Sequence, residues 1–332
     1  MTVTLPLPPG PLPGIGVGTW AWGNQFLWGY DPLQDAELEA TFRRAVALGL
    51  RLFDTADSYG TGRWLGRSEI LLGRFCAALP EAERRDLTLA TKLAPFPWRL
   101  GRGGYAKAFA ASRQRLLGRV DRVQLHWSTA RYAPWQEGPL LEGLADLVER
   151  GEVRELGVSN MGPRRLREAH AQLARRGVRL TSLQVQLSLL ALDPLTPDGV
   201  AGVCRELGIE LIAYSPLALG LLARPEAASA PLPRGPRRLL FQRLRPRLSL
   251  LLQGMERVAQ VHGADLVAVA LNWCRAHGAM PIPGLRRPDQ VEAAVAASTW
   301  ELSLEERDGL DQLARAAAAE GAKMPANPFQ SA

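Results

Sequence analysis

The sequence has few cysteines and no long apolar run, and both shortages narrow the possible kinds of protein. Its three cysteines, Cys76, Cys204 and Cys274, are widely spaced and odd in number, which argues against a disulfide framework or a cysteine metal site. They favour a reducing compartment, and we expect a cytoplasmic protein. No run reaches 18 apolar residues, so no membrane span is predicted. Residues 1–13 are rich in proline and lack the pattern of a signal peptide.

Lysine is also scarce, although the chain is basic. Lys and Arg total 40 against 33 Asp and Glu, a net charge of +7, but lysine occurs only at Lys92, Lys107 and Lys323. Such a bias toward arginine is weak support for nucleic-acid binding, which we do not expect. A basic rim that attracts a phosphorylated cofactor explains the charge with fewer assumptions.

Short apolar runs recur along the chain, each followed by a turn and then an amphipathic stretch. The runs predict eight strands: Ile15–Gly18, Leu50–Phe53, Leu87–Thr91, Val123–Leu125, Glu155–Val158, Ser182–Val185, Glu210–Ile212 and Ala279–Ile282. The stretches between them predict helices: Asp35–Leu48, Arg67–Ala78, Tyr105–Leu117, Pro139–Arg150, Pro163–Arg175 and Pro197–Leu207. Eight alternating units indicate an α/β fold, a closed (β/α)8 TIM barrel.

We expect one domain, 1–332, with the proline-rich segment 1–13 at its start and a tail at 320–332. The seventh and eighth strands are unusually far apart. Leu222–Pro246 is interpreted as a long loop, followed by helices at Ser249–Val261 and Ala264–His277. After the last strand, Pro288–Ala297 and the extra C-terminal stretch Ser303–Ala319 are predicted to be helical.

Polar residues follow several of the predicted strands. Asp54, Lys92 and His126 end the second, third and fourth strands, and Tyr59 lies five residues past Asp54. The carboxyl ends of barrel strands form one mouth, where active sites lie. An ammonium group lowers the pKa of a nearby phenol, so Lys92 beside Tyr59 would create a general acid. The alternatives are a structural Lys92–Asp54 salt bridge, an ordinary loop tyrosine and a structural histidine.

The sequence lacks the glycine patterns that usually bind dinucleotides or phosphates. The Gly-rich stretch 14–18 leads to Thr19 and Trp20 rather than into a helix, so it is no Rossmann fingerprint. With only His126 at a strand end, no metal site is expected either. Any dinucleotide must therefore be held by another arrangement.

At this point the motifs, taken in order, resemble those of the aldo-keto reductase family. The similar stretches span about 14–316 and are 53–60 (FDTADSYG), 91–92 (TK), 125–127 (LHW), 157–160 (GVSN), 213–220 (AYSPLALG) and 282–284 (IPG). The resemblance implies that Tyr59 donates a proton, that Lys92 paired with Asp54 lowers its pKa, and that His126 orients the carbonyl.

The resemblance also implies a nicotinamide stacked on Tyr214, with its carboxamide held by Ser159, Asn160 and Gln184. The other residues it implies for the cofactor are Thr19, Trp20, Asp54, Ser215, Pro216, Leu217, Leu219, Gly220, Pro283, Gly284, Arg286, Arg287 and Gln290. Ala293 and Ala294 stand where family members commonly carry an acidic residue and Asn for the adenine. Because Arg286 and Arg287 could pair with a 2′-phosphate, we favour NADPH over NADH; a solvated loop is the alternative.

Further stretches resemble the pyridoxal reductases of plant plastids and their bacterial relatives. They are 19–25 (TWAWGNQ), 124–132 (QLHWSTARY), 235–241 (GPRRLLF) and 327–330 (NPFQ). This implies reduction of the aldehyde pyridoxal to pyridoxine. Trp20, Trp22, Trp98 and Trp127 could form an aromatic pocket for such a flat substrate. The Arg-rich stretch 234–247 could fold over the cofactor phosphates or remain a solvated loop.

Other functions are left open by the residues. One is a broad reductase of aldehydes, ketones or quinones; another, of a different class, is a cofactor-sensing subunit like the potassium-channel β subunits of this fold. A phosphate-binding barrel lyase would need a Gly-rich phosphate loop that is not evident. We expect a small-molecule aldehyde as partner and a monomer or weak oligomer.

Overall fold

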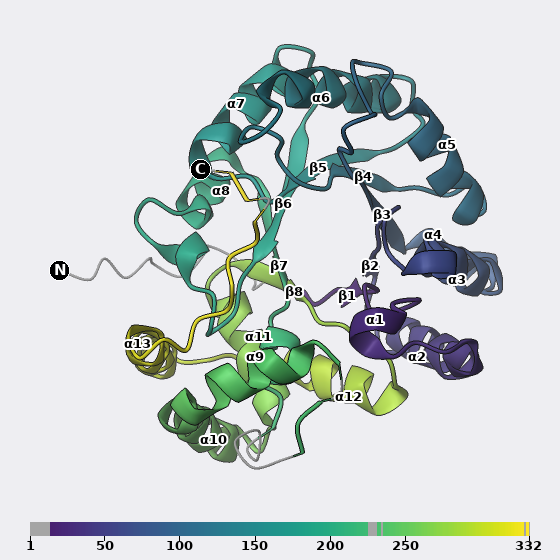
Figure 1. Cartoon of the computed structure of the whole chain (residues 1–332). Coiled ribbons are helices and arrows are strands. Elements are labelled where there is room, and N and C mark those ends of the chain that lie inside the picture. Colours follow the sequence, from purple (N-terminus) through teal and green to yellow (C-terminus); the bar gives the residue numbers. More distant parts are fainter. Residues whose placement is uncertain (1–13, 225–230, 234, 329, 332) are drawn as a thin grey trace.

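The computed structural model describes residues 14–224, 231–233, 235–328 and 330–331. Its eight strands run parallel in the order β1 to β8 (Figure 1). They are β1 (Val17–Gly18), β2 (Leu52–Asp54), β3 (Thr88–Leu93), β4 (Arg122–Leu125), β5 (Glu155–Ser159), β6 (Leu180–Gln186), β7 (Glu210–Tyr214) and β8 (Ala279–Ile282). A parallel bridge between Gly18 and Gly284 brings β8 back to β1. The predicted (β/α)8 barrel is confirmed.

Helices surround this sheet (Figure 1). They are α1 (Gln25–Trp28), α2 (Asp35–Ala47), α3 (Arg67–Ala77), α4 (Glu81–Arg85), α5 (Ala106–Arg115), α6 (Pro134–Glu149), α7 (Pro163–Ala174), α8 (Val200–Leu207), α9 (Arg237–Leu244), α10 (Ser249–His262), α11 (Leu266–Ala276), α12 (Pro288–Ala296) and α13 (Leu304–Ala319). Their apolar faces pack on the strands in one large core, in which Phe42 contacts Phe53 and Phe75. Within the described residues, no helix combines the length and apolarity that crossing a membrane requires.

The inside of the barrel is partly polar near its mouth. Lys92, Gln124, Ser182 and Gln184 are all buried there. Gly157 makes room for this layer, because a β-carbon at that position would lie 2.3 Å from the Ser182 hydroxyl oxygen. A barrel interior is normally filled with branched apolar side chains, so a buried polar layer indicates a functional site.

Two expectations about the helices were wrong. The helix expected from Pro139 begins at Pro134, and Pro139 lies inside it. Its buried Glu137 accepts hydrogen bonds from the Thr129 amide (3.0 Å) and Arg165 Nε (2.9 Å). Tertiary contacts therefore hold the first turns of α6 in place although Pro139 lacks an N–H.

The stretch interpreted as a long loop contains a helix, α9. Its apolar face explains why: Phe241 and Leu244 are buried in the main core. The short, arginine-rich sequence obscured this because the burial partners lie elsewhere in the chain. The Arg-rich stretch 234–247 is thus mostly helical, with Phe241, Leu244 and Arg245 buried, apart from residue 234, which lies outside the described residues.

Candidate active site

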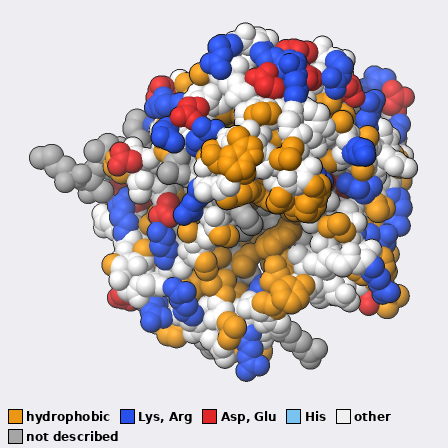
Figure 2. Space-filling model, turned by 45° about the horizontal axis from the view of Figure 1, so that its top comes forward, with side chains coloured by type: hydrophobic (Ala, Val, Ile, Leu, Met, Phe, Trp, Pro, Cys, Tyr) orange, Lys and Arg blue, Asp and Glu red, His pale blue; other side chains and the backbone are white. Residues whose placement is uncertain are grey.

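A cavity of about 1000 Å³ opens at the carboxyl ends of the strands. Figure 2 shows the hollow flanked by hydrophobic side chains, with most basic side chains toward the edge of this face. Asp54, Tyr59, Lys92 and His126 all line it, so the structure brings the four expected catalytic residues together.

Asp54 and Lys92 form the floor of the cavity as a buried ion pair. The ammonium also donates to the Thr55 carbonyl at 2.9 Å. The other Asp54 oxygen accepts from Gln124 Nε2 (3.0 Å) and Gln184 Nε2 (2.9 Å). A buried charge pair is stable only with such additional hydrogen bonds. Burial lowers the pKa of Lys92, and Asp54 opposes that shift.

Tyr59 lies beside this pair, on the loop after β2, with the Lys92 nitrogen 4.9 Å from its ring centre. The loop turns sharply at Gly60, where φ is +110° and a β-carbon would lie 1.9 Å from the Trp64 carbonyl oxygen. Burial raises the pKa of Tyr59 well above its usual value, and Asp54 raises it further. The expected lowering of this pKa is not found, because burial, the larger influence, and the Asp54 charge both raise it.

His126 faces Tyr59 across the cavity, with 5.7 Å between the ring centres. Burial lowers its pKa well below the usual value, and the Lys92 and Arg99 charges act in the same direction. The ring is therefore neutral near pH 7 and has one N–H to donate. Its Nδ1 lies 3.3 Å from the Ser58 hydroxyl, a neighbour that the sequence did not reveal as part of the site.

Three polar residues lie at the carboxyl ends of β5 and β6. The Ser159 hydroxyl donates to the Gln184 carbonyl (2.9 Å) and accepts from Asn160 Nδ2 (3.0 Å). Asn160 holds a left-handed backbone (φ +56°), which asparagine tolerates better than most residues. The expected carboxamide-binding group, Ser159, Asn160 and Gln184, is thus assembled and lines the cavity.

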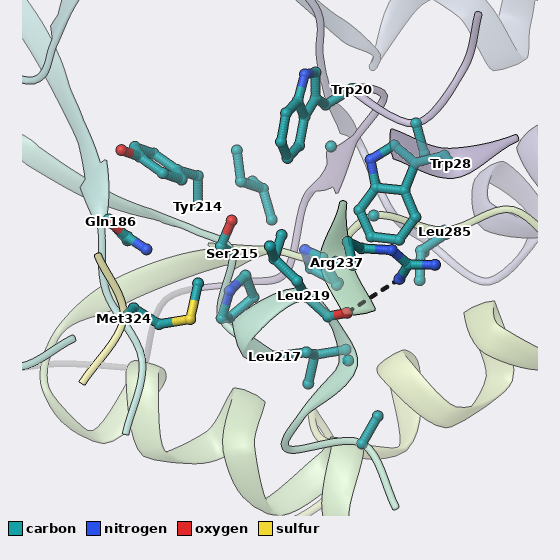
Figure 3. Close-up of a pocket in the computed structure, with 18 of the residues that line it drawn as sticks. Trp20, Trp28, Gln186, Tyr214, Ser215, Leu217, Leu219, Arg237, Leu285 and Met324 are labelled. Atoms are coloured by element: carbon teal, nitrogen blue, oxygen red, sulfur yellow. Dashed lines mark hydrogen bonds between the residues drawn. The ribbon is translucent and has the colours of Figure 1, made fainter. Parts of the chain in front are cut away.

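The chain after β7 is strained where it forms the next part of the wall. Ser215, Ala218 and Leu219 have positive φ values of 53°, 46° and 57°. Non-glycine residues adopt this conformation at a cost, and such strain clusters at ligand sites. Figure 3 shows Ser215 and Tyr214 facing the space below Trp20.

Arginines and a tryptophan form the outer part of the cavity. The Arg237 guanidinium lies 4.1 Å from the centre of the Trp28 ring, and that of Arg286 lies 5.7 Å away (Figure 3 shows Arg237 beside Trp28). Burial and the charge of Arg286 lower the pKa of Arg237. Among the described residues, the buried Arg237 Nε has no hydrogen-bond acceptor. An anionic group beside these two arginines would relieve their mutual repulsion, so this region fits a phosphate.

Most remaining expected cofactor residues also line the cavity: Trp20, Pro216, Leu217, Leu219, Gly220, Pro283, Gly284, Arg286, Arg287 and Gln290. Arg287 is engaged by Asp289 (2.9 Å), whereas Arg286 donates to the Trp28 carbonyl (2.7 Å). Ala293 lines the cavity, but Ala294 is buried in the core. The two alanines therefore do not contribute equally to the surface expected to receive an adenine.

Three expected residues do not reach the cavity. Trp22 is fully buried against Phe75 and donates to the Leu285 carbonyl at 2.8 Å. The chain turns after Gly18, so Trp22 points into the core although it lies near the end of the first strand. Trp98 is 74% exposed and stacks on Phe96, outside the cavity.

Thr19 is likewise buried beneath the cavity, where its hydroxyl bonds the Asp54 carbonyl at 2.9 Å. It supports the site without lining it. Trp127 does line the cavity, and its indole N–H donates to the Tyr132 hydroxyl at 2.6 Å. Of the four tryptophans expected around a substrate, Trp20 and Trp127 are therefore in place.

Several lining residues were not singled out from the sequence as site residues. They are Ser58, Trp28, Gln186, Arg237, Leu285, Met324 and Asn327. Arg237, Met324 and Asn327 belong to segments far from the barrel motifs in the chain, whereas Ser58 lies within the motif 53–60 and Leu285 directly follows 282–284. The resemblance of 327–330 to plastid-type reductases was the only sequence signal that pointed to the tail.

Comparison with known proteins agrees with this geometry. A model of the Aldo/keto reductase family matches residues 14–315. The chain belongs to the aldo/keto reductase family. It is therefore an oxidoreductase, and the family predicted from the sequence is confirmed.

Among curated relatives, this aldo/keto reductase is similar to the chloroplastic pyridoxal reductase of Arabidopsis thaliana. The two are 45% identical over 301 residues, 89% of this chain and 81% of the relative. An uncharacterized oxidoreductase of Mycobacterium tuberculosis is 36% identical over 306 residues, 90% of this chain and 88% of that protein. The predicted likeness to plastid-type reductases is confirmed as a likeness.

Solved structures of aldo-keto reductases share the fold. A thermostable member in complex with the inhibitor epalrestat has a TM-score of 0.72 at 27% identity, covering 91% of this chain and 95% of its own. A Klebsiella pneumoniae member in complex with NADPH has a TM-score of 0.70 at 23% identity, covering 97% and 95%.

Proposed function

We propose that this aldo/keto reductase uses NADPH to reduce an aldehyde to an alcohol, and that its substrate is pyridoxal, which becomes pyridoxine. The observation that carries the proposal is the meeting of Tyr59, Lys92, Asp54 and His126 on the floor of one cavity. The 45% identity to a pyridoxal reductase supports the choice of substrate.

The proton chemistry follows from the burial of Tyr59. Since its pKa is raised, the hydroxyl is protonated at neutral pH and able to donate. When NADPH is bound, its nicotinamide supplies the hydride. As negative charge grows on the carbonyl oxygen, Tyr59 would give up its proton, and the nearby Lys92 ammonium would stabilise the phenolate left behind.

His126 would serve as a second, neutral donor. Its lowered pKa keeps one N–H on the ring at neutral pH, so it can hydrogen-bond the carbonyl oxygen without adding a second cation beside Lys92. Preplaced donors are most effective where water is excluded and the local dielectric is low. Trp20 and Trp127 line the same part of the cavity and would help to exclude water.

The charges of the cavity also favour NADPH together with an uncharged substrate. Its described arginines come from the segment after β7 or the segment after β8: Arg224, Arg237, Arg245, Arg286 and Arg287. These residues would hold the cofactor phosphates. The floor, in contrast, has Lys92 already paired with Asp54. A flat, neutral aldehyde such as pyridoxal suits a cavity whose outer part is basic and whose floor carries an ion pair that is already matched.

A steady-state assay tests the proposal. We expect NADPH to be oxidised with pyridoxal, with kcat/KM at least tenfold lower when NADH replaces NADPH. Nitrobenzaldehyde should be a poorer substrate than pyridoxal. If both aldehydes react equally well, the chain is a broad-specificity reductase; if NADPH binds tightly and no aldehyde reacts, it is a cofactor sensor.

A further inference from the structure

The C-terminal tail returns to the barrel mouth after α13. Figure 1 shows it crossing from α13 toward α7 and α8. Backbone hydrogen bonds attach it on the way: the Met324 amide donates to the Leu190 carbonyl (2.8 Å) and the Ser331 amide to the Asn160 carbonyl (3.2 Å). The tail is therefore a fixed part of the wall, about 170 residues along the chain from the β5 end that it contacts.

One tail side chain joins the polar network of the site. Asn327 Nδ2 donates to the Tyr214 hydroxyl (2.9 Å) and to Asn160 Oδ1 (3.1 Å). The Tyr214 hydroxyl in turn donates to Asn160 Oδ1 at 3.0 Å. The three groups form a closed triangle in which both Asn327 hydrogens are used. Burial raises the pKa of Tyr214 to about 12, so its hydroxyl keeps the proton that this triangle needs.

Asn160 carries the connection further. Its Nδ2 donates to the His126 carbonyl (3.1 Å) and to the Ser159 hydroxyl (3.0 Å). All four hydrogen-bonding positions of its carboxamide are thus engaged. The Asn160 side chain is also almost fully buried. It therefore cannot move to a new set of partners when its hydrogen bond to Asn327 is lost.

We propose that Asn327 is a positioning residue, which holds the Tyr214 ring and, through Asn160, the backbone at His126 in the geometry that receives the nicotinamide. This inference rests on the proposed use of NADPH. A ring that serves as a stacking surface must be held in one orientation before the ligand arrives, since ordering it during binding would weaken affinity.

The tail has an independent anchor on its exposed side. Lys323 pairs with Asp193 at 2.8 Å, and neither residue lines the cavity. Replacing Lys323 with alanine therefore loosens the tail without touching the triangle. This variant is the matched control for a general effect of tail mobility.

The first test compares Asn327→Ala with Lys323→Ala and the unaltered chain, using NADPH titrations followed by tryptophan fluorescence. Net hydrogen bonds change equilibria by roughly two- to tenfold each, so we expect the NADPH Kd of Asn327→Ala to rise about three- to tenfold. The KM for the aldehyde should change less than twofold.

Lys323→Ala should keep its NADPH Kd within about twofold of that of the unaltered chain. An unchanged NADPH Kd in Asn327→Ala would overturn the proposal, as would an equal loss in Lys323→Ala.

The second test shows whether Asn327 acts through the Tyr214 hydroxyl. Tyr214→Phe keeps the ring and removes its hydrogen bonds. In that background, Asn327→Ala should weaken NADPH binding less than it does in the unaltered chain, because interacting residues are not additive. Full additivity would contradict the proposal. If Asn327→Ala fails to fold, Asn327→Asp keeps the size and removes both donors, with the same expected rise in Kd.

Failure of this inference is distinct from failure of the proposed function. An unaltered chain that binds no NADPH contradicts both. An unaltered chain that binds NADPH and reduces pyridoxal, beside an Asn327→Ala variant with the same Kd and KM values, contradicts the role of Asn327 alone.

Discussion

Two cation–carboxylate clusters, one buried and one partly exposed, lie at opposite ends of the same barrel. At the mouth, Lys92 pairs with Asp54, and both side chains are at most 3% exposed. At the other end, Arg122 at the start of β4 pairs with Glu155 (2.6 Å) and Glu210 (2.8 Å), whose side chains are 34% exposed. The first pair links the neighbouring strands β2 and β3 and lines the cavity of the site, whereas Arg122 links β4 to β5 and to the more distant β7 and does not line that cavity.

The two cations differ in what burial does to them. Burial lowers the pKa of Lys92. It would also lower that of Arg122, but Glu210 and Glu155 more than compensate, and the Arg122 pKa is raised. A guanidinium held by two carboxylates is a permanent cross-link. An ammonium with a movable pKa beside a phenol can take part in proton transfer. The mouth of a barrel is built for chemistry and the opposite end for stability.

Removing the phenol should have the largest effect and should leave stability intact. In Tyr59→Phe, the proton donor is lost, and we expect kcat/KM for aldehyde reduction to fall about 10²- to 10⁴-fold. NADPH affinity and the unfolding temperature should stay close to those of the unaltered chain. Steady-state rates, NADPH titration and thermal unfolding measure the three quantities.

Tyr105→Phe is the matched control for that substitution. Tyr105 is also buried, but its hydroxyl donates to the Leu93 carbonyl at 3.0 Å and does not line the cavity. Loss of this hydrogen bond should lower the free energy of unfolding by about 1 kcal/mol and leave turnover within about twofold of that of the unaltered chain. Comparable loss of turnover in both variants would mean that Tyr59 is structural.

At the end of the barrel opposite the mouth, a substitution should lower stability and leave turnover nearly unchanged. Arg122→Met leaves Glu155 and Glu210 facing each other without their shared cation. Because both carboxylates are partly exposed, we expect a loss of about 1–3 kcal/mol in the free energy of unfolding, at the low end for broken ion pairs. Urea unfolding measures this loss, and kcat/KM should remain within about threefold. A large loss of turnover at unchanged stability would contradict the assignment of catalysis to the mouth and of stability to the opposite end.

The mouth was predictable from the sequence because its residues obey a local rule. In a parallel barrel, polar residues directly after apolar strands converge, so Asp54, Lys92 and His126 could be grouped without coordinates. The pKa of Tyr59 could not be predicted in the same way. It depends on burial and on the distance to the Asp54 charge, and both are tertiary properties.

The parts that the sequence missed depend on contacts between distant segments. Helix α9 is short and rich in arginine, and it forms because Phe241 and Leu244 find partners elsewhere in the core. Asn327 reaches Tyr214 across 113 positions of the chain. Trp22 was misplaced for a local reason, since proximity to a strand end does not fix the direction of a side chain in the turn that follows Gly18.

The smallest effect should appear in the pH dependence of stability at the mouth. His126 has a lowered pKa in the folded chain, so below the unfolded value of about 6.5 the unfolded state binds a proton that the folded state does not. Stability contributed by this group is therefore present above pH 6.5 and falls as the pH decreases below that value. His126→Gln cannot take up that proton, so its loss of unfolding free energy between pH 7.5 and 5.5 should be smaller than that of the unaltered chain. His170→Gln, on α7 and outside the cavity, should behave like the unaltered chain. Urea unfolding at the two pH values measures the difference, and equal losses in His126→Gln and the unaltered chain would show that the mouth does not hold this histidine neutral.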